Sequence, residues 1–344
     1  MIIGWDIGGA HLKVAVVDTE GVITKVVQLP CPLWKGINEL EAAVESIIKE
    51  IPPRTALHVI TMTGELVDLF ETRKQGVNVI VQTMQQRFGA ENIKIFAGNK
   101  GFLAPQQFST EIVETIASAN WLASATFVAQ KINNGLFVDI GSTTTDILLC
   151  SHSVVAAQGM TDYERLISEE LIYTGIVRTP VMAVSQFAEF KGNRVGLMAE
   201  HFATMADVYR LTGELNEAHD QADTADGAAK TVTASARRLA RMIGYDYAIE
   251  EKSAWVQLAK NIRFRQLARI QRACERQLSR AILTPDDYFI GAGIGRFLVK
   301  QVANQLGHPY IDFSALLNCS SNDCEINIAD CAPAVSVGYL ARIS

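Results

Sequence analysis

The feature that most constrains the fold of this sequence is a short glycine turn that occurs twice. Asp6-Ile7-Gly8 and Asp139-Ile140-Gly141 each end an apolar, strand-like segment, and each leads into a second strand-like segment. A strand–turn–strand unit that recurs so far along one chain indicates an internal duplication. We therefore expect two related lobes, each built around its own copy of this unit.

Hydrophobic patterning predicts that strands and helices alternate in both halves of the chain. The expected strands are at 1–6, 12–18, 22–29, 57–62, 93–97, 135–140, 145–150, 287–290 and 310–311. The expected helices are at 38–50, 66–88, 118–132, 297–306 and 334–342. We expect an α/β protein with a first lobe at 1–134 and a second lobe at 135–344. A mostly helical insertion at about 161–283 would belong to the second lobe, and the closing helix would pack back on the first.

The two turns have the composition of phosphate-binding loops. Small residues let a phosphate approach backbone N–H groups, which donate hydrogen bonds to its oxygens. Asp6 and Asp139 would face that phosphate, and a divalent cation, most simply Mg²⁺, would relieve the repulsion between the two anions. Either turn alone is compatible with an ordinary hairpin, but two copies in matching contexts favour phosphate binding. The loop residues are Gly8, Gly9, Ala10 and His11 in the first copy, and Gly141, Ser142, Thr143 and Thr144 in the second.

A third glycine element, Gly291, Gly293 and Gly295, follows a strand-like segment and leads into a predicted helix. It resembles a dinucleotide-binding fingerprint, with Asp312 following the next strand. The spacing is GxGxG rather than GxGxxG, however, and the element lies near the C-terminus. We therefore interpret it as a backbone surface for a nucleoside or another flat group.

Three further charged residues are candidates for chemistry. Lys13 follows the first loop and either contacts a phosphate or lies on the surface. Glu65 follows a buried strand and either acts as a base or provides a charge at a helix N-terminus. Arg178 either clamps a diphosphate or carboxylate through its planar guanidinium, or forms a structural salt bridge.

Several carboxylates are candidate metal ligands. Asp146 lies one residue into the strand after the second loop, where it would be a second metal contact. Asp207 and Asp226 belong to a helical region in which His219, Asp220 and Asp223 add further candidate ligands. Carboxylates at helical spacing suit a metal–diphosphate site, while a solvated loop is the alternative.

Composition excludes some classes of protein. The net charge of −6 and the pI near 5.6 argue against a nucleic-acid partner. The apolar runs are too short to cross a bilayer, the N-terminus enters a strand without a basic region, and the six cysteines are scattered as in reduced proteins. We expect no membrane partner and a cytoplasmic location, and a homo-oligomer is compatible with the sequence.

The three glycine elements, in this order, resemble the phosphate and adenosine motifs of the actin-like ATPase superfamily, which includes actin, Hsp70 and sugar kinases. That resemblance implies a duplicated, ribonuclease H-like two-lobe fold with a helical insertion in the second lobe. It also implies Mg²⁺ as a cofactor and ATP as one candidate ligand.

Longer stretches carry a narrower resemblance. Residues 139–147 (DIGSTTTDI) and 173–180 (YTGIVRTP) resemble the hydantoinase A/oxoprolinase group. Residues 61–66, 119–123, 202–209 and 225–227 are similar to the branch linked to tetrahydromethanopterin-dependent one-carbon metabolism. This branch includes the condensing enzyme of methanofuran biosynthesis.

The narrower resemblance implies a transferase. An aminomethyl-furanylmethyl diphosphate would be joined to the phenol of a γ-glutamyl-tyramine, or to a related phenolic or amine acceptor, with release of diphosphate. The loops and Mg²⁺ would stabilise the leaving group, and a base would assist the phenol. The alternatives are an ATP-dependent kinase or hydantoinase-like enzyme and a non-catalytic nucleotide-binding protein, because the fold alone does not determine chemistry.

Overall fold

The computed structural model describes residues 1–51, 56–319 and 326–343. The chain forms two compact units. The first contains Met1–Gly135, Cys150–Ala156 and Asp312–Ser344, and the second contains Leu136–Leu149 and Ala157–Ile311.

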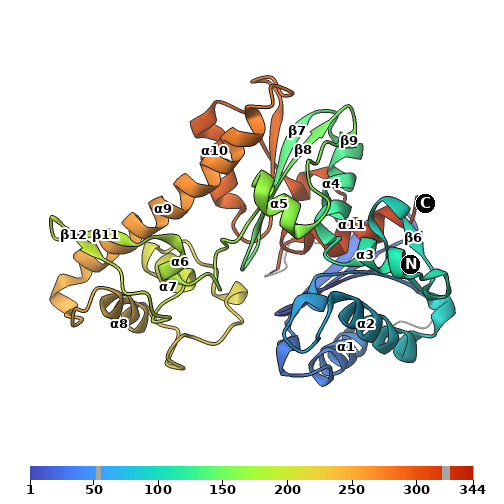
Figure 1. Cartoon of the computed structure of the whole chain (residues 1–344), viewed down its shortest axis with the longest axis horizontal. Helices are drawn as coiled ribbons and strands as arrows, with labels where there is room; N and C mark the ends of the chain where they lie inside the picture. Colours follow the sequence, from blue (N-terminus) through green and yellow to red (C-terminus); the bar gives the residue numbers. More distant parts are fainter. Residues whose placement is uncertain (52–55, 320–325, 344) are drawn as a thin grey trace. The chain divides into compact units, whose positions relative to one another are not determined.

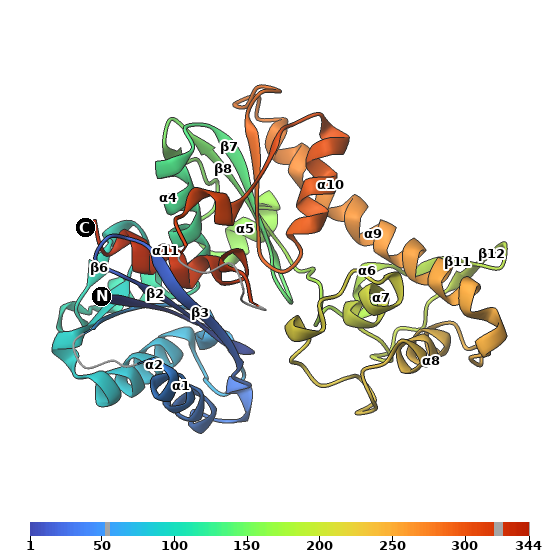
Figure 2. The same cartoon turned by 180° about the vertical axis from the view of Figure 1, so that it is seen from behind.

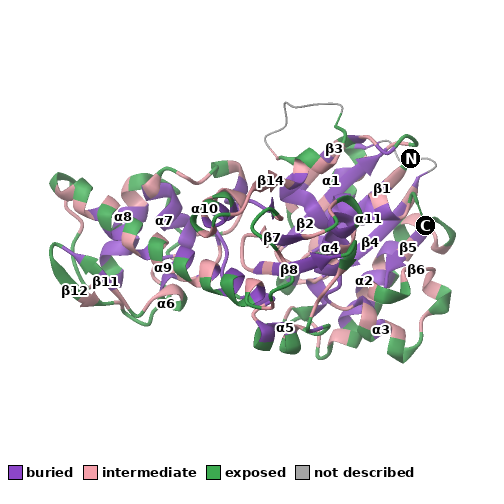
Figure 3. Cartoon of the chain, turned by 90° about the horizontal axis from the view of Figure 1, so that it is seen from above, coloured by how far each residue is buried: buried purple, intermediate pink, exposed green. Residues whose placement is uncertain are grey.

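The first unit is built on a six-stranded sheet with the order β3-β2-β1-β4-β5-β6. Strands β1, β2 and β3 form an antiparallel meander, while β4 and β5 run parallel to β1. The strands are β1 (Ile2–Ile7), β2 (His11–Val17), β3 (Ile23–Pro30), β4 (Leu57–Met62), β5 (Ile93–Phe96) and β6 (Phe102–Leu103). They are largely buried (Figure 3).

Helices cover both faces of this sheet (Figure 1). Helices α1 (Asn38–Glu50) and α2 (Arg73–Phe88) lie on one face, and α4 (Asn120–Lys131) and α11 (Ala332–Leu340) lie on the other. Successive side chains of β1 point to opposite faces of the sheet. Ile3, Trp5 and Ile7 point to one face, where they share a buried cluster with apolar residues of α1 and α2. Gly4 points the other way, and a Cβ there would lie 2.0 Å from Ala334 O of α11. A glycine at this position lets the closing helix lie directly on β1.

The second sheet repeats the central plan of the first, with the order β10-β8-β7-β13-β14 and with β9 paired to β8. Its strands are β7 (Gly135–Ile140), β8 (Thr145–Ser151), β9 (Val154–Val155), β10 (Leu171–Ile172), β13 (Tyr288–Ala292) and β14 (Tyr310–Asp312). Strands β1 and β7, which carry the two Asp-x-Gly turns, are therefore central in their sheets.

The predicted helical segment at about 161–283 is mostly helical. Its helices are α5 (Asp162–Ser168), α6 (Val181–Val184), α7 (Met205–Thr212), α8 (Val232–Met242) and α9 (Lys252–Leu278), and α10 (Arg296–Leu306) follows β13. The long helix α9 packs against α7, α8 and β11 (Figure 2). Strand β11 (Phe187–Phe190) pairs with β12 (Asn193–Gly196) in a hairpin that was not predicted from the sequence. Its signal is the pair Lys191-Gly192, both at positive φ as a two-residue hairpin turn requires.

The segment 66–88 is mainly helical, as expected, but its helix α2 begins only at Arg73, where the Thr72 side chain caps it by accepting from the Gln75 N–H. Helix α3 (Thr110–Ile116) was not predicted.

No single helix in the described part is long and apolar enough to span a membrane. Helices α3 and α4, which are bent by 67° to each other, reach the required length and apolar composition only when the two are counted as one segment.

Candidate functional site

The first glycine loop connects β1 and β2. The Gly8 N–H donates to the His11 carbonyl at 3.0 Å and closes the turn. The carbonyls of Gly9 and Ala10 accept hydrogen bonds from the N–H groups of Leu33 (3.0 Å) and Cys31 (2.9 Å). Since these carbonyls are occupied, the polar groups that the loop can offer a ligand are backbone N–H groups, which suit an anion.

Asp6 lies on β1 beside this loop and is only 5% exposed. The amide of Asn120, the first residue of α4, donates to Asp6 Oδ1 at 3.3 Å. Asp6 lies directly opposite Lys13 on β2 and beside Thr61 on β4. Residues in these register positions point to the same face of a sheet, so the side chains of Lys13 and Thr61 lie on the same face as that of Asp6.

Glu65 is buried in a short turn, Gly64–Leu66, directly after β4. The Ser118 hydroxyl donates to Glu65 Oε1 at 2.8 Å. Helix α2 approaches this turn closely: a Cβ on Gly76 would lie 2.7–2.8 Å from the Glu65 backbone and Cβ. Glu65 lies well before α2, which begins at Arg73, but it is the acidic residue in the first turn of the short 3-10 helix Gly64–Leu66, so its role as a helix N-terminal charge stays an alternative.

One turn between α3 and α4 contacts both carboxylates. Ser118, held at φ +52°, reaches Glu65, and Asn120 reaches Asp6 two residues later. Few residues other than glycine adopt this left-handed conformation, so the turn has a specific shape. Neither Ser118 nor Asn120 was predicted from the sequence as a site residue.

The second glycine loop is supported by the segment that contains Arg178. The Gly141 N–H donates to the Thr144 carbonyl at 2.9 Å. The Gly141 carbonyl accepts from Ile176 N–H (3.0 Å), and the Ser142 carbonyl accepts from the N–H groups of Val177 (3.1 Å) and Arg178 (2.8 Å). As in the first loop, these carbonyls are occupied, so the groups that suit an anion are the remaining backbone N–H groups and the hydroxyls of the loop.

Gly175 allows this supporting segment to lie against the loop, since a Cβ there would lie 2.4 Å from Thr143 N. The buried Gln266 amide of α9 donates to Thr174 Oγ1 at 2.7 Å and to the Gly175 carbonyl at 2.8 Å. The Tyr209 hydroxyl of α7 donates in turn to Gln266 Oε1. The helical insertion is thereby connected to the second loop through buried hydrogen bonds.

Arg178 itself is partly buried, and its Nη1 lies 3.4 Å from Thr143 Oγ1 of the loop. Burial lowers the pKa of Arg178 below its ordinary value, because desolvation disfavours the charged guanidinium. An anion bound beside Thr143 would offset that desolvation.

The third glycine element packs on the end of β7. Gly293 has φ +75°, and a Cβ there would lie 2.3 Å from Asp139 Oδ1 and from the Ile140 carbonyl. The Gly295 N–H donates to the Ile140 carbonyl at 2.9 Å. Gly291, in β13, is instead covered by the ring of Tyr310, which would lie 2.7 Å from a Cβ at that position. Gly293 and Gly295 thus adjoin the second loop and Asp139.

Asp146 is engaged by a cation of the protein. The Arg165 guanidinium bonds the Asp146 carboxylate and also donates to the Glu170 carbonyl at 3.3 Å. Burial raises the pKa of Asp146, and Arg165 opposes that rise. A metal ion at Asp146 would have to lie beside this guanidinium, so the geometry favours a structural ion pair.

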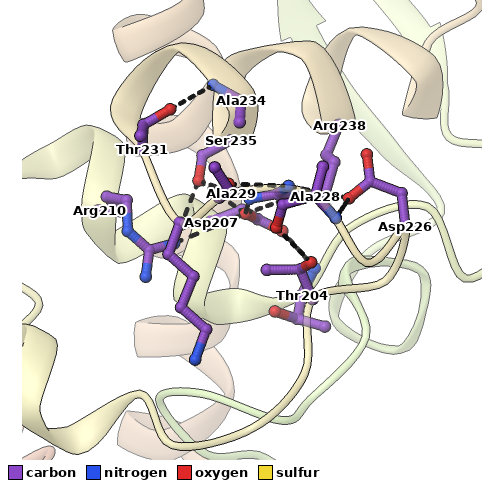
Figure 4. A network of polar contacts seen from close by, with 12 residues as sticks. Thr204, Asp207, Arg210, Asp226, Ala228, Ala229, Thr231, Ala234, Ser235 and Arg238 are labelled. Carbon is purple, nitrogen blue, oxygen red and sulfur yellow. Dashed lines mark hydrogen bonds and ion pairs between the residues drawn. The ribbon is translucent and has the colours of Figure 1, made fainter.

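Asp207 and Asp226 share Arg238 (Figure 4). Asp207 accepts from Arg238 Nε at 2.8 Å, from Ser235 Oγ at 2.7 Å and from Thr204 N–H at 3.0 Å. Asp226 Oδ2 lies 2.9 Å from Arg241 Nη1.

Asp220 also belongs to this network, through Arg210. In the described part of the chain no three His, Cys, Asp or Glu side chains form a metal-binding group. These carboxylates therefore neutralise buried arginines, and the geometry favours a structural role for them.

The overall fold is shared with solved structures. Acetone carboxylase in its nucleotide-free form matches with a TM-score of 0.58 at 10% identity, over 98% of this chain and 70% of that chain. The chain shares its two-sheet α/β fold with that structure, which confirms the expected fold class.

Sequence comparison defines the family. The hydantoinase/oxoprolinase family model matches residues 57–318. A Methanocaldococcus jannaschii protein is 35% identical over 247 residues, which cover 72% of each chain. A Methanococcus vannielii protein is 39% identical over 104 residues, 30% of this chain and 46% of that protein. Both relatives are named (4-{4-[2-(gamma-L-glutamylamino)ethyl]phenoxymethyl}furan-2-yl)methanamine synthase. This chain belongs to the hydantoinase/oxoprolinase family.

Proposed function

We propose that this protein is a transferase of methanofuran-type cofactor biosynthesis. It would join an aminomethyl-furanylmethyl diphosphate to the phenol of a γ-glutamyl-tyramine and release diphosphate. The names of the two relatives describe a product in which a phenol oxygen and a furanylmethyl carbon form an ether. The observation that carries the proposal is the first-unit site, where buried Asp6 adjoins a glycine loop and a second buried carboxylate, Glu65, lies close to the end of the neighbouring strand.

The proposed reaction exchanges one C–O bond for another. The bond between the furanylmethyl carbon and the diphosphate oxygen breaks, and its electron pair leaves with diphosphate. The phenol oxygen forms the new bond to the same carbon, and Glu65 accepts the phenol proton. Ser118, which donates to Glu65 Oε1 at 2.8 Å, orients the carboxylate for this role.

The leaving group needs stabilisation of negative charge. The backbone N–H groups of the first loop would donate to phosphate oxygens. Asp6 and Asp139 are the carboxylates that suit Mg²⁺, because each lies at the end of a strand beside a glycine turn and offers oxygen ligands. Asp146, Asp207 and Asp226 suit it less, since arginines already neutralise them. When bound, the ion would neutralise charge on the departing diphosphate.

The test is a reaction of purified protein with Mg²⁺, the furanylmethyl diphosphate and γ-glutamyl-tyramine, followed by mass spectrometry for the ether. We expect ether and diphosphate in equal amounts, and loss of both with Glu65→Gln. ATP consumption with ADP formation and no ether would refute the proposal and favour a kinase or hydantoinase-like enzyme. Binding of ATP without turnover would favour a nucleotide-binding protein.

A further inference from the structure

Thr61 has an unexplained hydroxyl group at the centre of the first unit. It lies near the end of β4, its side chain is fully buried, and its Oγ1 has no hydrogen-bond partner among the described residues. Valine has the same shape without the hydroxyl, and a buried hydroxyl without a partner destabilises a fold. A threonine here is explained if a ligand supplies the missing partner.

The neighbours of Thr61 indicate the kind of ligand. Thr61 is paired in register with Asp6, which is paired on its other side with Lys13. The three side chains form a row on one face of the sheet, with adjacent strands about 4.8 Å apart. The side chains of a lysine and a threonine therefore lie on the same sheet face as one carboxylate, at the carboxyl ends of the parallel strands β1 and β4, where ligands bind in open α/β sheets.

The row is also deeply placed, since Asp6 is 5% exposed and Thr61 is 0% exposed. Because Thr61 is fully covered in this structure, a ligand atom contacts its hydroxyl only if the covering atoms shift, and a small terminal atom requires a smaller shift than an aromatic ring. A terminal phosphate oxygen is small and accepts hydrogen bonds from both an ammonium and a hydroxyl. We propose that Thr61 is a ligand-binding residue whose hydroxyl donates to a terminal oxygen of bound diphosphate. This inference rests on the proposed function, which names diphosphate as the leaving group.

Two substitutions of Thr61 separate binding from stability. Thr61→Val keeps the volume and removes the hydroxyl, so the midpoint of thermal unfolding should stay equal or rise. Thr61→Ser keeps the hydroxyl and removes a buried methyl group, so the midpoint should fall. Ser336→Ala in α11 is the matched control, because Ser336 Oγ is also buried without a partner among the described residues.

The measurement is calorimetric titration of the full chain with inorganic diphosphate in the presence of Mg²⁺. We expect Thr61→Val to bind diphosphate about tenfold or more weakly, because it removes a hydrogen bond to a charged group. Thr61→Ser and Ser336→Ala should stay within about threefold of the unmodified protein.

Equal affinity of Thr61→Val and the unmodified protein would overturn the inference and leave the proposed function standing. Equal losses in Thr61→Val and Thr61→Ser would also overturn it, because packing rather than the hydroxyl would then be responsible. If the unmodified protein bound no diphosphate, both the proposed function and the inference would fail.

Discussion

Replacing Gly293 with alanine tests how the third glycine element is held against the second loop. Gly293 has φ +75°, and a Cβ there would lie 2.3 Å from Asp139 Oδ1 and from the Ile140 carbonyl. The positive φ costs an alanine about 1–2 kcal/mol, and forcing an atom into a packed site adds about 1–3 kcal/mol. We expect Gly293→Ala to lower the free energy of unfolding by about 2–5 kcal/mol. Activity should fall at least about tenfold, because Asp139 has to move.

Gly307 provides the matched control for this substitution. It has nearly the same backbone conformation, φ +76°, but nothing lies within 4 Å of the position of its Cβ. Gly307→Ala should therefore show the backbone cost alone, about 1–2 kcal/mol, with activity retained. Urea unfolding of both variants measures the difference, and an activity assay accompanies it. Equal losses of stability in the two variants would refute the close approach of Gly293 to Asp139.

Three further results are expected. Asp6→Asn should reduce activity by at least about a hundredfold with little change in the thermal midpoint, and retained activity would show that the first loop has been misinterpreted. Asp207→Asn should lower the free energy of unfolding by about 1.5–3 kcal/mol, because buried Arg238 loses one of its two charged partners and keeps Asp226. A thermal melt measures this loss. Burial lowers the pKa of His58 to about 4 in the folded chain. As the pH falls, His58 is therefore protonated at a higher pH in the unfolded chain than in the folded chain. Stability should therefore fall by about 3 kcal/mol as pH decreases from 6.5 to 4, and His58→Gln should abolish that slope.

The fold was largely predictable because its signals are local. The two Asp-x-Gly turns lie between apolar strands, and each short segment carries its own hydrophobic pattern and turn residues. These signals placed β1, β2, β7 and β8 close to their observed positions. The hairpin of β11 and β12 was missed because a two-residue turn within a mostly helical region is a weak signal.

The candidate site was only partly predictable, because its contacts join distant parts of the chain. Asn120 contacts Asp6 from 114 residues away, and Ser118 contacts Glu65 from 53 residues away. Neither pairing leaves a trace in local spacing. Thr61 was part of a recognised motif, but its missing hydrogen-bond partner is a property of the folded chain.

The predicted metal role of Asp207 and Asp226 illustrates a different difficulty. The three-residue spacing of Asp220, Asp223 and Asp226 suits a metal site, and it equally suits carboxylates that neutralise arginines. Arg238 comes from α8, after the loop that contains Asp226, and the folded chain brings it together with Asp207 and Asp226. Carboxylate spacing alone does not distinguish these outcomes, because the choice depends on which cation the fold supplies.

An isotope-labelling experiment tests the central claim most directly. A furanylmethyl diphosphate with ¹⁸O in the bridge between carbon and phosphorus would react with γ-glutamyl-tyramine, and ³¹P NMR and mass spectrometry would locate the label. If diphosphate is the leaving group in C–O cleavage, all of the ¹⁸O is found in the released diphosphate. Label that remains on a furanylmethyl alcohol would show P–O cleavage and contradict the account.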